Sequence, residues 1–194
     1  LTRAPAAGVR VSGTGVGGLG AIYGNVSNPF LTGVVILDGD ALVRNDNSGE
    51  TIFFNGDVSD VGLTGAGTLT LMGAGGFTFN SGNANNNDRG LITETSSANP
   101  VSLVIQGPGT TIINPNANTF TGPVTIDGGT LRVARFADIG ANSPIGKGDS
   151  TSVATNRASL VFGGGQLRYT QSTNATTDRL FTLGDASGLT GTLS

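Results

Sequence analysis

Apolar and polar residues alternate over short stretches of this chain, and glycine-containing corners separate one stretch from the next. The clearest example lies within residues 118–140. Val124 and Ile126 alternate with polar residues, as expected for a strand that buries one face. The sequence Asp-Gly-Gly at 127–129 predicts a tight corner, because glycine adopts positive φ without a Cβ clash. The alternation resumes at Leu131, so this stretch is predicted to form a strand, a corner and a second strand.

This strand-corner-strand unit recurs along the chain. Residues 31–42, LTGVVILDGDAL, align with residues 120–131, FTGPVTIDGGTL, with identical residues at six positions. A weaker similarity relates residues 65–71 to residues 107–113. A hairpin does not require such recurrence, whereas stacked coils do, since each coil covers the face that its neighbour leaves open. The sequence therefore predicts an all-β fold of the β-solenoid class.

Alternating segments extend over most of the chain, and we expect one stacked domain over residues 1–194. In the first copy of the unit, the Asp-Gly-Asp sequence at 38–40 is predicted to form the corner. The polar stretch 80–90 is predicted to protrude as a loop, and residues 134–139 are the one place where a helical turn or two is expected. The repeat-like units are predicted near residues 28–44, 64–79, 106–133 and 159–183.

The alternation also predicts which side chains face the core. In the second repeat-like unit, Leu69 and Leu71 should point inward from one strand, and Phe77 and Phe79 from the next. Outward positions are mostly threonine, serine and asparagine. Side chains on alternate positions of a strand point to opposite faces, so this pattern places a continuous apolar column inside the stack.

Composition supports short strands joined by corners. Glycine accounts for 33 of 194 residues, charged residues for 12 % and hydrophobic residues for 37 %, below the roughly 45–50 % usual in globular domains. Disorder is the alternative for a chain so rich in glycine and asparagine. The regular apolar alternation and a net charge of only −3 argue against it. A nucleic-acid partner is not expected, because it would require a basic stripe.

The residue types that are absent from the chain make some classes of function less expected than others. There is no cysteine, which suits a chain exported unfolded through a compartment where disulfides form, and no histidine, the commonest metal ligand and general base. No apolar run approaches the ~20 residues that span a bilayer. Residues 1–5 lack Met and the apolar core of a signal peptide, so the chain is predicted to be processed or part of a longer one. The pattern continues up to Ser194, so more polypeptide or a second molecule is expected to cover that end.

Three groups of residues invite a chemical interpretation. The acidic residues Asp38, Asp40, Asp46 and Glu50 suggest calcium, but Leu42 stands where an EF-hand needs an oxygen ligand, so a surface loop is favoured. The glycine-rich residues 13–18 have no following lysine or helix, and corners are favoured over a phosphate site.

A β-helix enzyme would use paired carboxylates, for which Asp38 and Asp127 are the candidates. The repeat alignment places these two at the same corner position, which explains both without catalysis. No catalytic, cofactor-binding or metal-binding residue and no cofactor is therefore expected.

The stretch NTFTGPVTIDGGTLRV, residues 118–133, closely resembles the autotransporter-associated β-strand repeat, also called the passenger-associated transport repeat, of bacterial passenger domains. Residues 65–73 resemble the first half of the same repeat. Departures from the pattern are Asn114, Pro115, Asn116 and Pro123, the last of which is expected to remove a donor from within a strand. The matching positions are Gly107, Gly109, Asn118, Thr119, Phe120, Thr121, Gly122, Ile126, Gly128, Gly129, Thr130 and Leu131.

The resemblance implies an exported, right-handed parallel β-helix that is extracellular or presented at the bacterial cell surface in association with the outer membrane. It implies no catalytic residues. The expected function is a structural, adhesin-like stalk or passenger segment; the alternatives are a subunit that stacks head to tail in an extracellular filament, and a polysaccharide-active enzyme. A host or matrix glycan is a possible partner, for which Tyr23, Tyr169 and the 80–90 loop are the candidate positions. The positions expected to matter structurally are Phe120, Thr121, Gly122, Val124, Ile126, Gly128, Gly129, Leu131, Thr32, Gly33, Leu37, Gly39 and Leu42.

Overall fold

The computed structural model describes residues 8–80, 89–184 and 192–193. Strands dominate these residues, with a 3-10 turn at Val16–Gly18 and one helix, α1 (Val153–Ala158). The strands are β1 (Val9–Gly13), β2 (Ile22–Gly24), β3 (Phe30–Leu31), β4 (Val35–Asn45), β5 (Thr51–Phe54), β6 (Val58–Ser59), β7 (Gly67–Met72), β8 (Gly76–Phe79), β9 (Ile92–Thr93), β10 (Val101–Gln106), β11 (Thr110–Ile113), β12 (Val124–Ile126), β13 (Thr130–Val133), β14 (Leu160–Phe162), β15 (Gln166–Tyr169), β16 (Thr182–Leu183) and β17 (Thr192–Leu193).

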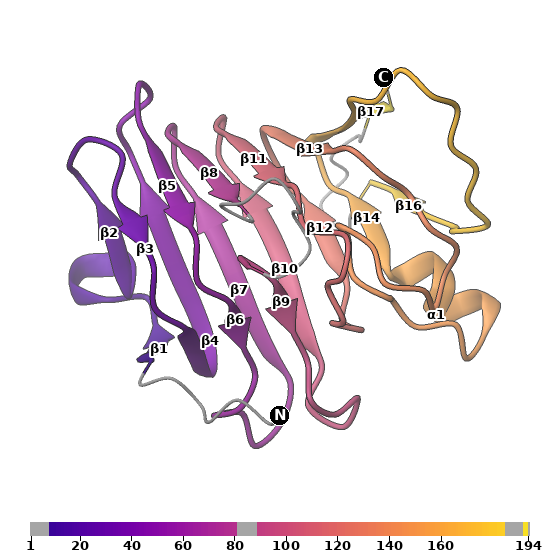
Figure 1. The fold of residues 1–194 in the computed structure, drawn as a ribbon, viewed down its shortest axis with the longest axis horizontal. Helices are drawn as coiled ribbons and strands as arrows, with labels where there is room; N and C mark the ends of the chain where they lie inside the picture. The colour runs from indigo at the N-terminus through magenta and orange to yellow at the C-terminus, as the bar shows by residue number, and fades with distance from the viewer. Residues whose placement is uncertain (1–7, 81–88, 185–191, 194) are drawn as a thin grey trace.

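The strands form two parallel sheets, to which successive turns of the chain contribute in sequence (Figure 1). The first sheet has the order β16-β14-β12-β10-β7-β4-β6-β9, with β1 and β2 also paired to β4. The second has the order β17-β15-β13-β11-β8-β5-β3. The chain passes from β7 to β8, from β10 to β11, from β12 to β13 and from β14 to β15, so each of these coils contributes a strand to each sheet, while β6 and β9 extend the first sheet beyond β4. The predicted all-β fold of stacked parallel coils is confirmed.

The core is a set of apolar columns that run from coil to coil. Leu69 pairs with Leu103, which pairs with Val124, and all three side chains are fully buried. In the second sheet, the stacked rings of Phe54 and Phe79 have centroids 4.4 Å apart. Because parallel strands pair in register, like positions of successive coils lie on top of one another. The inward orientations predicted for Val124, Ile126, Leu131, Leu69, Leu71, Phe77 and Phe79 are confirmed.

Glycine is required at the corner between the two sheets because the corners of successive coils stack backbone on backbone. Gly129 has φ +61, and a Cβ there would overlap the carbonyl oxygen of Gly109. A Cβ at Gly109 would in turn overlap the carbonyl oxygen of Gly75. The corner at 127–129 is thus confirmed, and its glycines are explained by conformation and by space.

Two predictions of local structure in the second half of the chain are wrong. Residues 134–139 form no helix; the helix lies at 153–158, where Ser152 and Thr155 form a capping box. The backbone of 137–139 instead bonds to a later segment, with Ile139 N donating to Asp178 Oδ1 at 2.8 Å. Pro123 also lies just before β12 rather than within it, and its carbonyl accepts from Leu103 N.

The corner predicted at 38–40 is also absent, because these residues lie inside the long strand β4. Val35 in β4 pairs with Val58 of β6, whereas Ala41 pairs with Leu69 of β7. Residues 31–42 therefore run from the end of β3 in the second sheet into the first sheet, while the similar residues 120–131 turn from the first sheet into the second. The two segments are alike in sequence but occupy different positions in their coils. Residues 65–71 and 107–113 are also alike in sequence but differently placed, since the former lead into the first sheet and the latter into the second.

Candidate functional site

A third row of stacked segments closes each coil on the way from the second sheet back to the first. Residues 118–121 lie in this row, next to β9 on one side and to residues near 147 on the other. Thr119 N donates to Ile92 O at 3.1 Å, and Lys147 N donates to Phe120 O at 2.8 Å. The segment therefore pairs with both neighbouring coils, although it is not itself a regular strand.

Asn118 links three successive coils through its side chain. It is fully buried, and its Oδ1 accepts from Ile92 N at 2.8 Å. Its Nδ2 donates to Pro115 O at 3.0 Å, and to Ser143 O and Pro144 O at 3.2 Å each. A buried amide is stable only when both its donor and its acceptor are satisfied. Asparagine provides both groups here, which gives a physical reason for this residue at the start of the segment.

Thr121 and Thr119 attach the same segment to Glu94 in the preceding coil. Thr121 Oγ1 donates to Glu94 Oε1 at 2.6 Å, and Thr121 N donates to Glu94 Oε2 at 2.9 Å. Glu94 Oε2 also accepts from Val101 N at 2.9 Å. Glu94 N donates to Thr119 Oγ1 at 2.8 Å. Glu94 was not identified from the sequence, and no local pattern marks it, because its partner lies in the next coil.

The remaining positions of the segment are filled by packing. Phe120 is fully buried in the core, and a Cβ at Gly146 would press against its ring. Gly122 is buried against the preceding coil, and a Cβ there would overlap the carbonyl oxygen of Val101. Residues 118–122 are thus held by contacts with neighbouring coils at nearly every position, and we refer to them as the coil-joining segment.

The corresponding positions of the first copy have different surroundings. Leu37 and Leu42 are buried, but Thr32 and Gly33 are exposed. A Cβ at Gly33 would meet open space, and one at Gly39 would come no closer than 3.9 Å to Ser12. Because residues 31–42 occupy a different part of their coil, these positions do not make the contacts of the coil-joining segment. The structural importance of both sets stays a prediction.

The acidic residues do not converge. Asp38 accepts from Arg10 Nε at 2.8 Å, Asp40 from Thr68 N at 2.8 Å, and Asp46 from Arg44 Nε at 2.8 Å, which raises the pKa of Arg44. No group of three His, Cys, Asp or Glu residues within 8–80, 89–184 and 192–193 is arranged to hold a metal ion.

The carboxylates proposed for an enzyme are also separate. Asp38 lies in β4 and Asp127 follows β12, with β7 and β10 between these strands in the sheet. Their equivalence in the sequence alignment is not reproduced in space.

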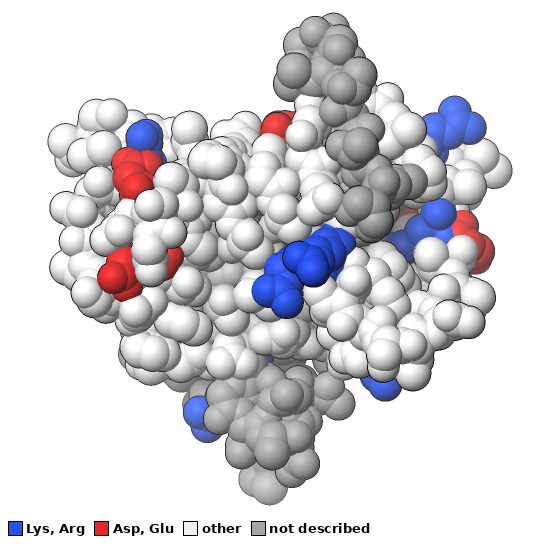
Figure 2. Space-filling view, turned by 90° about the horizontal axis from the view of Figure 1, so that it is seen from above, with Lys and Arg blue, Asp and Glu red and all other residues white. Residues whose placement is uncertain are grey.

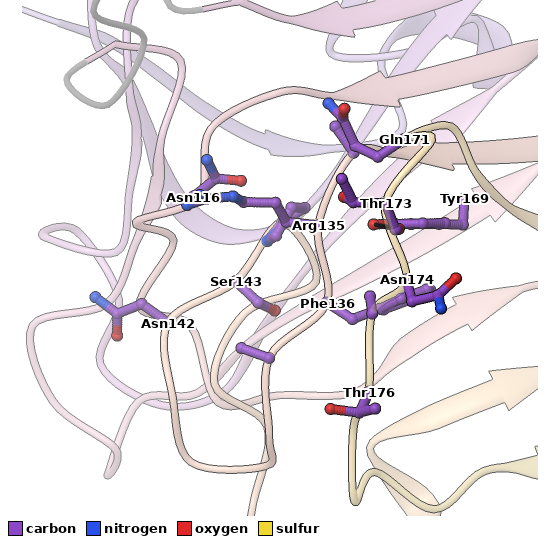
Figure 3. A pocket seen from close by; sticks show the side chains of 14 residues that line it. Asn116, Arg135, Phe136, Asn142, Ser143, Tyr169, Gln171, Thr173, Asn174 and Thr176 are labelled. Atoms are coloured by element: carbon purple, nitrogen blue, oxygen red, sulfur yellow. Dashed lines mark hydrogen bonds between the residues drawn. The ribbon is translucent and has the colours of Figure 1, made fainter.

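A cleft of about 540 Å³ opens beside the ends of β13 and β15 (Figure 3). Tyr169 and Phe136 form one wall, with ring centroids 5.3 Å apart and planes at 22°. The other labelled side chains include Asn116, Arg135 and Asn174, which supply amides and one cation. Of the glycan positions expected from sequence, Tyr169 lies here and Tyr23 lies away on β2. Most of the 80–90 loop, residues 81–88, lies outside the described residues.

Comparison with known protein families finds a match in the region of the chain that contains the coil-joining segment. Residues 103–133 match the passenger-associated-transport-repeat family, a range that begins in β10, ends with β13 and contains the coil-joining segment. The chain is 36 % identical over 155 residues, 77 % of its length, to the adhesin BmaC autotransporter of Brucella suis biovar 1 (strain 1330). It spans 4 % of the length of that relative. No solved structure matches the chain.

Proposed function

We propose that this chain, whose residues 103–133 match the passenger-associated transport repeat, is a passenger segment of the autotransporter type. Residues 1–194 form one stretch of a right-handed parallel β-helix within a much longer exported polypeptide at the bacterial cell surface. The segment is a structural stalk that carries and spaces adhesive regions. The name of the relative, an adhesin, supports this role, and so does the small part of that protein which the chain spans.

The observation that carries the proposal is the coil-joining segment. Asn118 bonds to the coil before it and to the coil after it, and it lies in the part of the chain that matches the repeat family. Each coil presents donors and acceptors that the next coil must satisfy, because an unpaired buried polar group is costly. We propose that a folded coil presents the groups with which the next coil pairs, so that the repeat lets the stack grow. Folding then proceeds coil by coil.

A non-catalytic role is part of the proposal. The two candidate carboxylates are separated by β7 and β10, and the relative's name, an adhesin, supports a role without catalysis. No helix among the described residues has the length and apolar character needed to cross a bilayer.

The test is the native polypeptide in its source bacterium. An antibody against this chain should detect a product far larger than 19.3 kDa in the outer-membrane fraction, and protease added to intact cells should remove it. The substitution Asn118→Asp in the full gene should reduce the surface-exposed amount, while Asn25→Asp, at an exposed position, should not. A product confined to the cytoplasm would overturn the proposal.

The alternative, an extracellular filament of stacked copies, makes a different prediction. Released product near 19.3 kDa that forms large assemblies would favour it. Light scattering coupled to size exclusion over a concentration series separates the two, since a chain that stays monomeric at every concentration excludes the filament.

A further inference from the structure

Two arginines lie side by side on the outside of the second sheet. Arg132 of β13 pairs directly with Arg168 of β15, and the flanking residues Leu131, Val133 and Leu167 are buried, so both arginine side chains face outward. Among the described residues neither has an ion-pair partner, and Arg132 Nε is buried without an acceptor. Like charges at directly paired positions repel each other. An anion bound between them would remove this repulsion.

The arrangement of charge around this pair is uneven. Arg135 lines the cleft beside the ends of the same two strands and also has no ion pair among the described residues. Figure 2 shows one group of Lys and Arg side chains in the middle of the face in view, with other cations toward its edges, while Asp and Glu lie mainly toward the side of the earlier coils. The chain as a whole carries a net charge of −3, so a local group of unpaired cations needs an explanation.

Unpartnered polar atoms occur in two hollows next to the arginine pair. A hollow of about 420 Å³ is lined by Arg132 and Glu50, and both Arg132 Nε and Glu50 Oε2 are buried there without a hydrogen-bond partner. In the cleft, Asn116 Oδ1 is likewise buried without a partner. A lone anion satisfies only donors. A ligand rich in hydroxyl groups satisfies both kinds of atom, because a hydroxyl donates and accepts.

The cleft adds an aromatic wall. The stacked rings of Phe136 and Tyr169 offer apolar surface, while Tyr169 Oη is held by Thr173 O at 2.8 Å. Figure 3 shows Arg135 and Asn116 across the cleft from this pair. Sugars present both hydroxyl edges and C–H faces, which suits an amide-lined cleft with one aromatic side.

We propose that this surface binds an acidic polysaccharide. Its carboxylate or sulfate groups lie on Arg132 and Arg168, a neighbouring sugar occupies the Phe136–Tyr169 cleft, and hydroxyl groups meet the unpartnered oxygens. The proposal names the ligand class of the adhesin-type segment and so rests on the proposed function. A polysaccharide is favoured over nucleic acid because the cations are few and acceptors such as Glu50 lie among them.

The test uses the purified chain with four probes: heparin, polygalacturonate, dextran and a short DNA duplex, each measured by calorimetry at two salt concentrations. Heparin or polygalacturonate should bind and dextran should not. Heparin carries both sulfate and carboxylate groups and polygalacturonate carries carboxylate alone, so binding of heparin but not polygalacturonate would identify sulfate as the required anion. The double variant R132Q/R168Q should weaken binding at least tenfold, about the loss expected for removing charge-assisted bidentate contacts.

The matched control is R89Q/R157Q, which removes the same charge from two exposed arginines that line neither the cleft nor the hollow. It should bind within about twofold of wild type, since distant surface charges are screened by salt. The variant R132K/R168K, which keeps the charge but not the planar fork, should bind with intermediate affinity. Circular dichroism of every variant verifies folding.

An equal loss in both double glutamine variants, or DNA binding as tight as heparin, would overturn the proposal, because attraction would then be general to polyanions. Failure of the folded chain to bind either acidic polysaccharide would also overturn it. That failure leaves the stalk role intact, since the location of the native polypeptide in the outer membrane is measured separately.

Discussion

Arg179 Nη2 donates a hydrogen bond to the carbonyl oxygen of Gly146 at 2.7 Å, deep inside the third row of segments. The side chain is only 7 % exposed, and it also bonds to Ala137 O at 2.9 Å through Nε and to Lys147 O at 2.9 Å through Nη2. Burial lowers the pKa of Arg179, while the charges of Asp178 and Asp138 oppose this shift. One guanidinium thus satisfies the carbonyl groups of three residues in the preceding segment.

Replacing this guanidinium should destabilise the fold. Arg179→Met keeps much of the apolar stem but leaves several carbonyls without a donor, and we expect a loss of about 2–4 kcal/mol in the free energy of unfolding. Urea unfolding followed by circular dichroism measures it. Arg157→Met, on the exposed helix α1, is the control and should stay within about 0.5 kcal/mol of wild type. Equal stability of the two variants would show that the Arg179 contacts contribute little.

Asn118→Asp is the sharpest test of the coil-joining segment. The change keeps the size and the acceptor for Ile92 N but removes the donors to Pro115, Ser143 and Pro144 and adds a buried charge. A loss of about 2–4 kcal/mol in unfolding free energy is expected. Asn25→Asp, with an exposed side chain, controls for the charge. If both variants unfold at the same urea concentration, the amide does not join the coils as described.

Corner and non-corner glycines should respond oppositely to alanine. Gly129→Ala forces a Cβ into a left-handed conformation and against Gly109, at an expected cost of about 1–3 kcal/mol or more. Gly33→Ala meets open space, and reduced freedom of the unfolded chain should stabilise the protein by up to about 1 kcal/mol. Thermal unfolding of both variants decides this. Similar destabilisation at both sites would mean that Gly33 has a role that the contacts do not show.

Leu131→Asp should prevent folding. Leu131 is fully buried between Thr111 and Leu167 in the second sheet, so the carboxylate would lie in the core without a partner. The far-UV spectrum should lose its strand signal. Thr125→Asp, on the outer side of β12, should remain folded. A Leu131→Asp variant that melts like wild type would disprove the inward assignment.

Asp149 should make stability depend on acid pH. Its Oδ1 accepts from Thr151 Oγ1 at 2.6 Å and from Thr151 N at 2.8 Å, and these bonds lower the pKa of Asp149 below its ordinary value. A carboxyl with a lowered pKa stabilises the fold fully above its unfolded pKa of about 3.9, and this contribution is lost as pH falls through the folded pKa. Asp149→Ala should therefore be less stable than wild type at pH 7, with a smaller difference near pH 3. Urea unfolding at both pH values tests this, and a constant difference would contradict it.

Local features of this protein could be predicted because local geometry controls them. Val124, Ile126 and Leu131 alternate with outward residues, and a strand has only two faces. The corner at 127–129 follows in the same way from the conformational freedom of glycine. Glu94 could not be found, because its role depends on which segment of the next coil lies beside it. The helix expected at 134–139 does not form for a related reason. Hydrogen bonds with Asp178 and Arg179, far along the chain, keep that backbone out of a helical conformation.

The amino-acid pattern was sufficient for the class of fold, the positions of most strands, the apolar column within the stack and the resemblance to passenger repeats. It was not sufficient to show which part of its coil each segment occupies, which we call the phase of the segment. Residues 31–42 and 120–131 are similar because a strand, a glycine corner and a strand make the same local demands wherever they occur. Only the pairing of Val35 with Val58, and of Val124 with Leu103, places them in different parts of the coil. Phase is a property of strand register between coils, and the register is set by contacts between residues distant in the sequence.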